Sequence, residues 1–234
     1  LRFGLEIVDL TEIVADVEFK VFSGAIKSGG VVRGLNAKTA GSLTRREIDD
    51  LGRLAVENGA KGMAWILVTE NELRSPITKF LTAAEIQKIL KALDAEPGDL
   101  LLFGADSHLV VAKALGAVRS AIAKKMNLID EDSLQFAWIT DFPLLEYDDE
   151  EKRYIAVHHP FTAPQQKDLL HMESEPLRVK ARAYDLVLNG TEIGGGSIRI
   201  HNRDLQEKMF SLLGIETEEA QAKFGYMLEA FEYG

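Results

Sequence analysis

The chain contains no cysteine, and this absence excludes several kinds of chemistry. It rules out disulfides, a thiol nucleophile and a zinc site built on cysteine, and it is typical of an intracellular protein. Long hydrophobic runs are missing too, because no apolar stretch approaches the roughly 20 residues that span a membrane, and the N-terminus shows no signal-peptide pattern. We therefore expect a cytoplasmic protein with no membrane partner.

Positive charge is in deficit. The 27 Lys and Arg residues against 37 Asp and Glu residues give a formal net charge of −10, which argues against a broad surface for nucleic-acid phosphates. What is present is an ordinary globular composition, with 234 residues of which 46% are hydrophobic and 27% charged. This length fits one or two domains with a sizeable core.

The first half of the chain shows helices alternating with short apolar strands. Two capping-box patterns, Thr44 to Glu47 and Thr82 to Glu85, predict the starts of two helices. Apolar runs predict strands at residues 19–22, 31–35, 63–68 and 99–103. This half is therefore expected to form a compact α+β or α/β unit.

Strands predominate from residue 131 onward. They are predicted at residues 136–140, 154–158, 184–188 and 191–200, ahead of two C-terminal helices. Strands followed by helices favour a mainly antiparallel sheet, and we predict an α+β fold for the whole chain. Residues 160–180 hold three of the six prolines and are expected to form a long loop of the kind that is often functional.

A hairpin predicted at Asn189 and Gly190 carries the most chemistry. This dipeptide favours a two-residue type I′ turn, which would pair Leu188 with Thr191, Val187 with Glu192 and Leu186 with Ile193. Directly opposed residues share a sheet face, so one face should be apolar and the other should carry Asp185 and Glu192. Two neighbouring carboxylates either raise one pKa or hold a cation.

The glycine run that follows corrects the phase of the second strand. A bulge within Gly194, Gly195 and Gly196 would move Ser197, Arg199 and His201 onto the carboxylate face. Such a face suits a phosphate-bearing, metal-neutralised ligand together with a carboxylate bound by Arg199. The alternative is a glycine-rich bulge beside a surface Glu–Arg pair.

His158 and His159 begin the long loop. Adjacent residues on a strand point to opposite faces, so a site made by both histidines is disfavoured, and a single histidine that hydrogen-bonds a substrate is the better interpretation. A small metalloenzyme that uses His158, His159 and Glu192 is the remaining alternative.

At this point the sequence shows a resemblance to a known family. The segments Trp-Ile-Thr-Asp-Phe-Pro (138–143), His-His-Pro-Phe-Thr-Ala-Pro (158–164) and residues 184–201 resemble the catalytic domain of the bacterial-type aspartyl-tRNA synthetases, a class II family. The first half resembles the GAD domain inserted into that catalytic domain, with residues 42–45, 59–62 and 103–106 matching best. The resemblance implies a GAD-like domain at 1–130, whose first ten or so residues link from the catalytic domain, and a partial class II catalytic domain at 131–234.

The resemblance also implies a reaction and its ligands. Enzymes of this family activate L-aspartate with ATP and Mg²⁺ and transfer the aspartyl group to tRNA. It assigns the substrate aspartate to His158 and Arg199, ATP and the metal to Glu192 with Asp185, and the adenylate to the backbone of Gly194, Gly195 and Gly196. His159 and Ser197 are secondary candidates, and no residue is expected to act as nucleophile or base.

Parts of the family pattern are absent from these residues. The anticodon-binding barrel, the dimer-forming motif and two arginine-bearing ATP motifs are not found, so we expect a fragment that is inactive alone, binds no cofactor tightly and lacks the parent's homodimer contact. The alternative is that the GAD-like half is a module that binds tRNA or a protein partner without catalysis.

Overall fold

The computed structural model describes residues 3–231, which divide into two compact units between Ser133 and Leu134. We call residues 3–133 unit 1 and residues 134–231 unit 2. Among the described helices, none combines the length and apolar character needed to cross a membrane.

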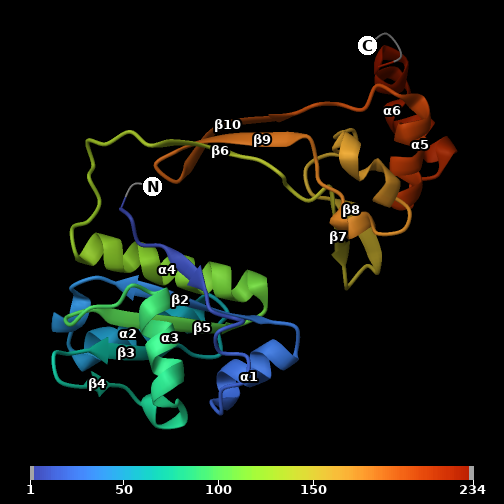
Figure 1. The fold of residues 1–234 in the computed structure, drawn as a ribbon. Helices are drawn as coiled ribbons and strands as arrows, with labels where there is room; N and C mark the ends of the chain where they lie inside the picture. Colours follow the sequence, from blue (N-terminus) through green and yellow to red (C-terminus); the bar gives the residue numbers. More distant parts are fainter. Residues whose placement is uncertain (1–2, 232–234) are drawn as a thin grey trace. The chain divides into compact units, whose positions relative to one another are not determined.

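Unit 1 is built on one antiparallel sheet (Figure 1). Its strands are β1 (Ile7–Asp9), β2 (Val31–Ala37), β3 (Ala64–Val68), β4 (Leu73–Arg74) and β5 (Leu100–Asp106), in the spatial order β1-β2-β5-β3-β4. Strand β5 is central, and Leu100 to Phe103 are all buried because the sheet is covered on both faces. This explains why β5 reads as a continuous apolar run rather than an alternating one.

Helices cover both faces of this sheet. They are α1 (Lys20–Lys27), α2 (Arg45–Glu57), α3 (Ala83–Ala92) and α4 (His108–Lys125). One core joins Leu100 and Leu102 to α2 and α4, and the other joins Leu101 and Phe103 to α1 and α3. The alternation of β5 side chains between two cores therefore fixes which helices lie on which side.

The local signals for helix starts in unit 1 are confirmed. Thr44 and Glu47 form a complete capping box at α2, and Thr82 and Glu85 form another at α3. The strand predicted at residues 19–22 is wrong, because these residues enter helix α1. In that helix Val21 is 54% exposed, whereas Phe22 is buried and Phe19 packs partly against the same core.

Unit 2 contains a three-stranded antiparallel sheet and a separate hairpin (Figure 1). The sheet has the order β10-β9-β6, with β6 (Phe136–Ile139), β9 (Ala183–Leu188) and β10 (Thr191–Ser197). The hairpin pairs β7 (Leu145–Asp148) with β8 (Arg153–Ala156), and the acidic run after Asp148 forms its turn. The predicted strand at 154–158 thus begins and ends earlier than expected.

Two helices, α5 (Arg203–Leu212) and α6 (Thr217–Phe231), complete unit 2 as predicted. The predicted long loop contains short 3₁₀ turns, η3 (Gln166–His171) and η4 (Pro176–Arg178), and it packs through Met172 and Val179 into a core with Met209. The α+β fold class is confirmed, and its strand pairings are all antiparallel among the described residues.

One face of the β6-β9-β10 sheet is apolar yet open. The register places Phe136 opposite Leu188 and Trp138 opposite Leu186, and Tyr184 follows on the same face. Trp138 is 63% exposed and Phe136 58% exposed. Contiguous exposed aromatic residues of this kind are typical of a surface that another element covers.

Candidate functional site

The hairpin that carries the predicted site forms as expected. Asn189 and Gly190 have φ values of 52° and 86°, as a type I′ turn requires. Leu188 pairs with Thr191 and Val187 with Glu192. The turn chemistry therefore sets the register in which the two carboxylates are presented.

The bulge lies one step earlier than predicted. The register shifts between Glu192 and Gly194, so Leu186 opposes Gly194 and not Ile193. Ile193 is the extra residue and is 52% exposed. The phase correction is nevertheless the expected one, because Gly195 now opposes Asp185 and Ser197 opposes Ala183. Ser197 thus shares a face with Asp185 and Glu192, which we call the carboxylate face.

The two carboxylates converge above Gly195. A Cβ atom built on Gly195 would lie 2.5 Å from Asp185 Oδ1 and 3.1 Å from Glu192 Oε1. A Cβ atom on Gly194 would meet nothing within 4 Å, whereas one on Gly196 would lie 2.8 Å from the hydroxyl of Tyr184 on the opposite face. The glycine at 195 is therefore what allows Asp185 and Glu192 to approach one another.

Arg199 lies at the far end of the same face. Its Nη1 donates a hydrogen bond to Ser197 Oγ at 2.9 Å. Thr162, which the sequence analysis did not select, is 1% exposed, and its hydroxyl donates to the same Ser197 oxygen at 3.4 Å. Thr162 and Arg199 also form an antiparallel β-bridge. The loop after the two histidines is thus tied directly to the strand that carries the arginine.

The two histidines face different surroundings. The ring of His158 packs edge-on against Phe142, with centroids 4.7 Å apart. Burial lowers the pKa of the His159 imidazole, and the positive charge of nearby Arg199 lowers it further. The amide of Phe161 donates to His159 Nδ1 at 3.3 Å, which leaves Nε2 as the donor nitrogen. His159 is therefore a neutral hydrogen-bond donor beside Arg199.

The chemistry of the donor set on the carboxylate face fits magnesium. Mg²⁺ binds through one or two carboxylates together with water and substrate phosphates, and Asp185 and Glu192 supply two converging carboxylates. Within residues 3–231, no group of three or more histidine, aspartate or glutamate side chains could hold a metal by itself. A metal centre built from His158, His159 and Glu192 is thus not formed.

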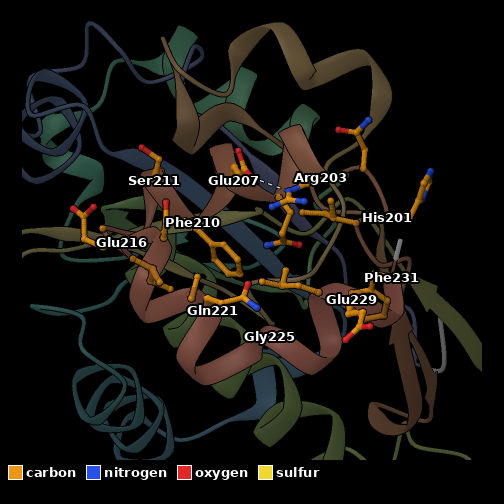
Figure 2. Close-up of a pocket in the computed structure, with 18 residues that line it drawn as sticks. His201, Arg203, Glu207, Phe210, Ser211, Glu216, Gln221, Gly225, Glu229 and Phe231 are labelled. Atoms are coloured by element: carbon orange, nitrogen blue, oxygen red, sulfur yellow. Dashed lines mark hydrogen bonds and ion pairs between the residues drawn. The ribbon is translucent and has the colours of Figure 1, made fainter. Parts of the chain in front are cut away.

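A pocket of about 440 Å³ lies between α5 and α6 (Figure 2). It begins at Ile200 and His201, directly after Arg199, and is walled by Phe210 and Phe231. Figure 2 shows the Arg203–Glu207 ion pair, 3.1 Å long, at its edge. Of the residues that the sequence placed on the carboxylate face, His201 lines this pocket, whereas none of the residues assigned to aspartate, ATP, metal or adenylate does.

Comparison with known proteins links the chain to one group. The family model described as "GAD domain" matches residues 22–115. The chain is 68% identical over all 234 residues to the aspartate–tRNA(Asp/Asn) ligase of Syntrophomonas wolfei, covering 40% of that protein. It is 57% identical to the aspartate–tRNA(Asp/Asn) ligase of Heliobacterium modesticaldum, covering 39% of it. Identity to the aspartate–tRNA ligase of Halalkalibacterium halodurans is 55%, again over 39% of that protein.

Proposed function

We propose that this chain, which contains a match to the GAD domain and spans about 40% of the length of the aspartate–tRNA(Asp/Asn) ligases that it matches, supplies part of the active site of such a ligase. In this proposal the whole enzyme joins L-aspartate to tRNA by way of an aspartyl-adenylate formed from ATP. A cytoplasmic location goes with that role. The observation that carries the proposal is the single face holding Asp185, Glu192, Ser197 and Arg199.

Arg199 is the group that binds the side-chain carboxylate of aspartate. Its guanidinium offers several donors in a fixed plane, which suits a carboxylate better than an ammonium group does. The neutral His159 adds a donor next to it without adding a second charge. The family resemblance assigns His158 to the same substrate. His158 is therefore a second candidate for contact with aspartate, from the side of the loop that faces Phe142.

Glu192 and Asp185 are the groups that would hold magnesium. Bound there, the metal would supply neutralisation of the negative charge on the phosphates of ATP. The backbone of Gly194, Gly195 and Gly196 leaves room on the strand for the adenylate to lie close. The protein's own contribution is to position two reactants and to place charge, so no side chain has to act as nucleophile or base.

Unit 1 is proposed to be the GAD insertion and unit 2 the partial catalytic domain, with their boundary near residue 130. The longer ligase is proposed to act as a homodimer through segments outside this chain. Since about 60% of the relatives' length is not included, the 234-residue chain alone should lack aspartate-dependent ATP–pyrophosphate exchange. Robust exchange by the isolated chain would contradict this part of the proposal.

A segment-replacement experiment tests the function. We would exchange the matching segment of the Syntrophomonas wolfei ligase for this chain, with the unmodified ligase as the control. The hybrid should catalyse aspartate-dependent pyrophosphate exchange and charge tRNA. A hybrid that folds and binds tRNA but performs neither reaction would overturn the proposal.

The second candidate, a GAD module that binds tRNA by itself, is supported by the separate two-sided core of unit 1. The net charge of −10 gives it no electrostatic support. Titrating tRNA against the 234-residue chain over a range of salt separates the two candidates. Salt-dependent binding of tRNA would favour the tRNA-binding module, and an absence of such binding would exclude that candidate function.

A further inference from the structure

We propose that Ser197 is a positioning residue for Arg199: its hydroxyl fixes the direction in which the guanidinium meets an anionic substrate group. The catalytic consequence rests on the proposed function, whereas the contact itself rests only on the geometry of unit 2. Ser197 touches no reacting atom in this arrangement and acts through Arg199.

The first support is the contact between the two side chains. Arg199 is exposed, and a long exposed arginine loses considerable rotamer freedom when it is held in one direction. The hydrogen bond from Nη1 to Ser197 Oγ at 2.9 Å offsets part of that loss before any ligand arrives. A guanidinium held in this way binds a carboxylate with less further ordering.

The second support is that Ser197 is itself held. It is only partly exposed, and its oxygen also accepts a hydrogen bond from the buried hydroxyl of Thr162. A hydroxyl has two acceptor positions and one donor. With both acceptor positions used by Thr162 and Arg199, the remaining hydrogen of Ser197 is directed as a donor.

The third support is that the backbone around Arg199 is fixed on both sides. The amide of Ala163 donates to Ile198 O at 2.8 Å, and the amide of Ile200 donates to Phe161 O at 2.8 Å. These bonds flank the bridge between Thr162 and Arg199. Since the main chain is already constrained, the direction of the guanidinium depends on its own side-chain torsions, which the contact with Ser197 restricts.

The geometric part is tested on the 234-residue chain by nitrogen NMR of the arginine side chains. Ser197→Ala should shift the Nε–Hε signal of Arg199 and speed rotation about its Cζ–Nε bond. The control Ser211→Ala, at an exposed position of α5, should change neither. Ser197→Thr, which keeps the hydroxyl, should restore the slow rotation. Unchanged Arg199 signals in Ser197→Ala would overturn the contact, whatever the function of the chain.

The functional part is tested in the active hybrid ligase. Ser197→Ala should raise the KM for aspartate about tenfold, as expected for a weakened charged hydrogen-bond site, with the KM for ATP changed less than about twofold. Ser197→Thr should recover most of the aspartate KM, and Ser211→Ala should match the parent hybrid. Equal changes in both KM values, or no change, would overturn the positioning role.

The two failures can be told apart. A hybrid that is inactive with every native residue in place counts against the proposed function, and the NMR result then decides alone whether Ser197 holds Arg199. An active hybrid with an unchanged aspartate KM in Ser197→Ala counts against the positioning role and leaves the proposed function standing.

Discussion

Lys125, at the end of α4, places its Nζ atom 2.6 Å from Oε1 of Glu47 in the first turn of α2. The contact joins the two helices that cover one face of the unit 1 sheet. It also adds a cross-helix partner to a carboxylate that already accepts the backbone amide of Thr44. The capping box of α2 is therefore part of the packing of unit 1 as well as a local helix start.

This relationship predicts an acid-dependent loss of stability. The hydrogen bond from Lys125, followed by those from Thr44, lowers the pKa of Glu47 to about 2. A lowered folded-state pKa contributes stability that is present above about pH 4.5 and lost as the pH falls toward 2. We expect Glu47→Gln to lower the Tm at pH 7 and to flatten its fall below pH 4.5, as measured by circular dichroism. Parallel Tm curves for the parent and Glu47→Gln would contradict the assignment.

Removal of the buried Asp99 carboxylate should destabilise unit 1. Asp99 is 2% exposed and accepts hydrogen bonds from the amides of Thr39 and Glu96 and from Asn36 Nδ2, at 2.9–3.0 Å. Asp99→Ala leaves these donors without their partner, so the free energy of unfolding should fall by at least about 2 kcal/mol. The matched control is the exposed Asp94, where Asp94→Asn should change it by less than about 0.5 kcal/mol. Urea unfolding of both variants gives the comparison, and equal effects would argue against a structural role for Asp99.

Two neighbouring glycines should respond differently to alanine. A Cβ atom at Gly195 would lie 2.5 Å from Asp185 Oδ1, but one at Gly194 would meet nothing within 4 Å. In the hybrid ligase, Gly195→Ala should reduce pyrophosphate exchange by about ten- to a hundredfold, because the carboxylates are displaced. Gly194→Ala should reduce exchange less, because its Cβ would lie on the Leu186 side of the sheet, away from the carboxylates. Similar rates for the two variants would show that the carboxylates above Gly195 do not hold the metal.

Loss of the Arg199 guanidinium should weaken aspartate use specifically. Arg199→Ala in the hybrid removes a charged hydrogen-bond partner, which is expected to cost about 2–3 kcal/mol in kcat/KM for aspartate. Steady-state exchange kinetics with varied aspartate and varied ATP measure this effect. An unchanged kcat/KM for aspartate would exclude Arg199 from substrate binding.

The open apolar sheet face should be visible in tryptophan fluorescence. Trp138 is 63% exposed, and Trp65, the other tryptophan, is packed against a core. In Trp65→Phe, the remaining Trp138 should emit at long wavelength and be quenched readily by acrylamide. In Trp138→Phe, Trp65 should be quenched much less. Equal quenching of the two variants would mean that the face is covered in the isolated chain.

Local signals were enough to predict much of the fold and part of the candidate site. The capping boxes and the Asn189–Gly190 turn depend on residues close in sequence, so the sequence alone placed two helix starts and the pairing of Val187 with Glu192. The family resemblance rested on long ordered motifs, and it is confirmed by the matched relatives.

Features that depend on tertiary packing could not be predicted from sequence patterns. The apolar run at residues 19–22 predicts a strand, but these residues begin helix α1, because Phe22 packs from a helix onto a sheet distant in sequence. The sequence pattern predicts the bulge within the glycine run, but the extra residue is Ile193. One extra residue anywhere near the glycines restores the alternation of side chains, so the pattern does not fix its position. The role of Thr162 follows from a bridge between segments far apart in the chain, for which no local pattern exists.

The bulge at Ile193 makes the number of residues between Glu192 and Arg199 as important as their identity. Because side chains alternate along a strand, deleting one residue from this stretch would turn Arg199 toward the side of Tyr184 while Glu192 stayed in place. Whether a change in the length of this hairpin is tolerated therefore depends on whether the number of residues changed is odd or even. A single insertion or deletion separates the arginine from the carboxylates, whereas a change of two residues keeps all of them on the same side.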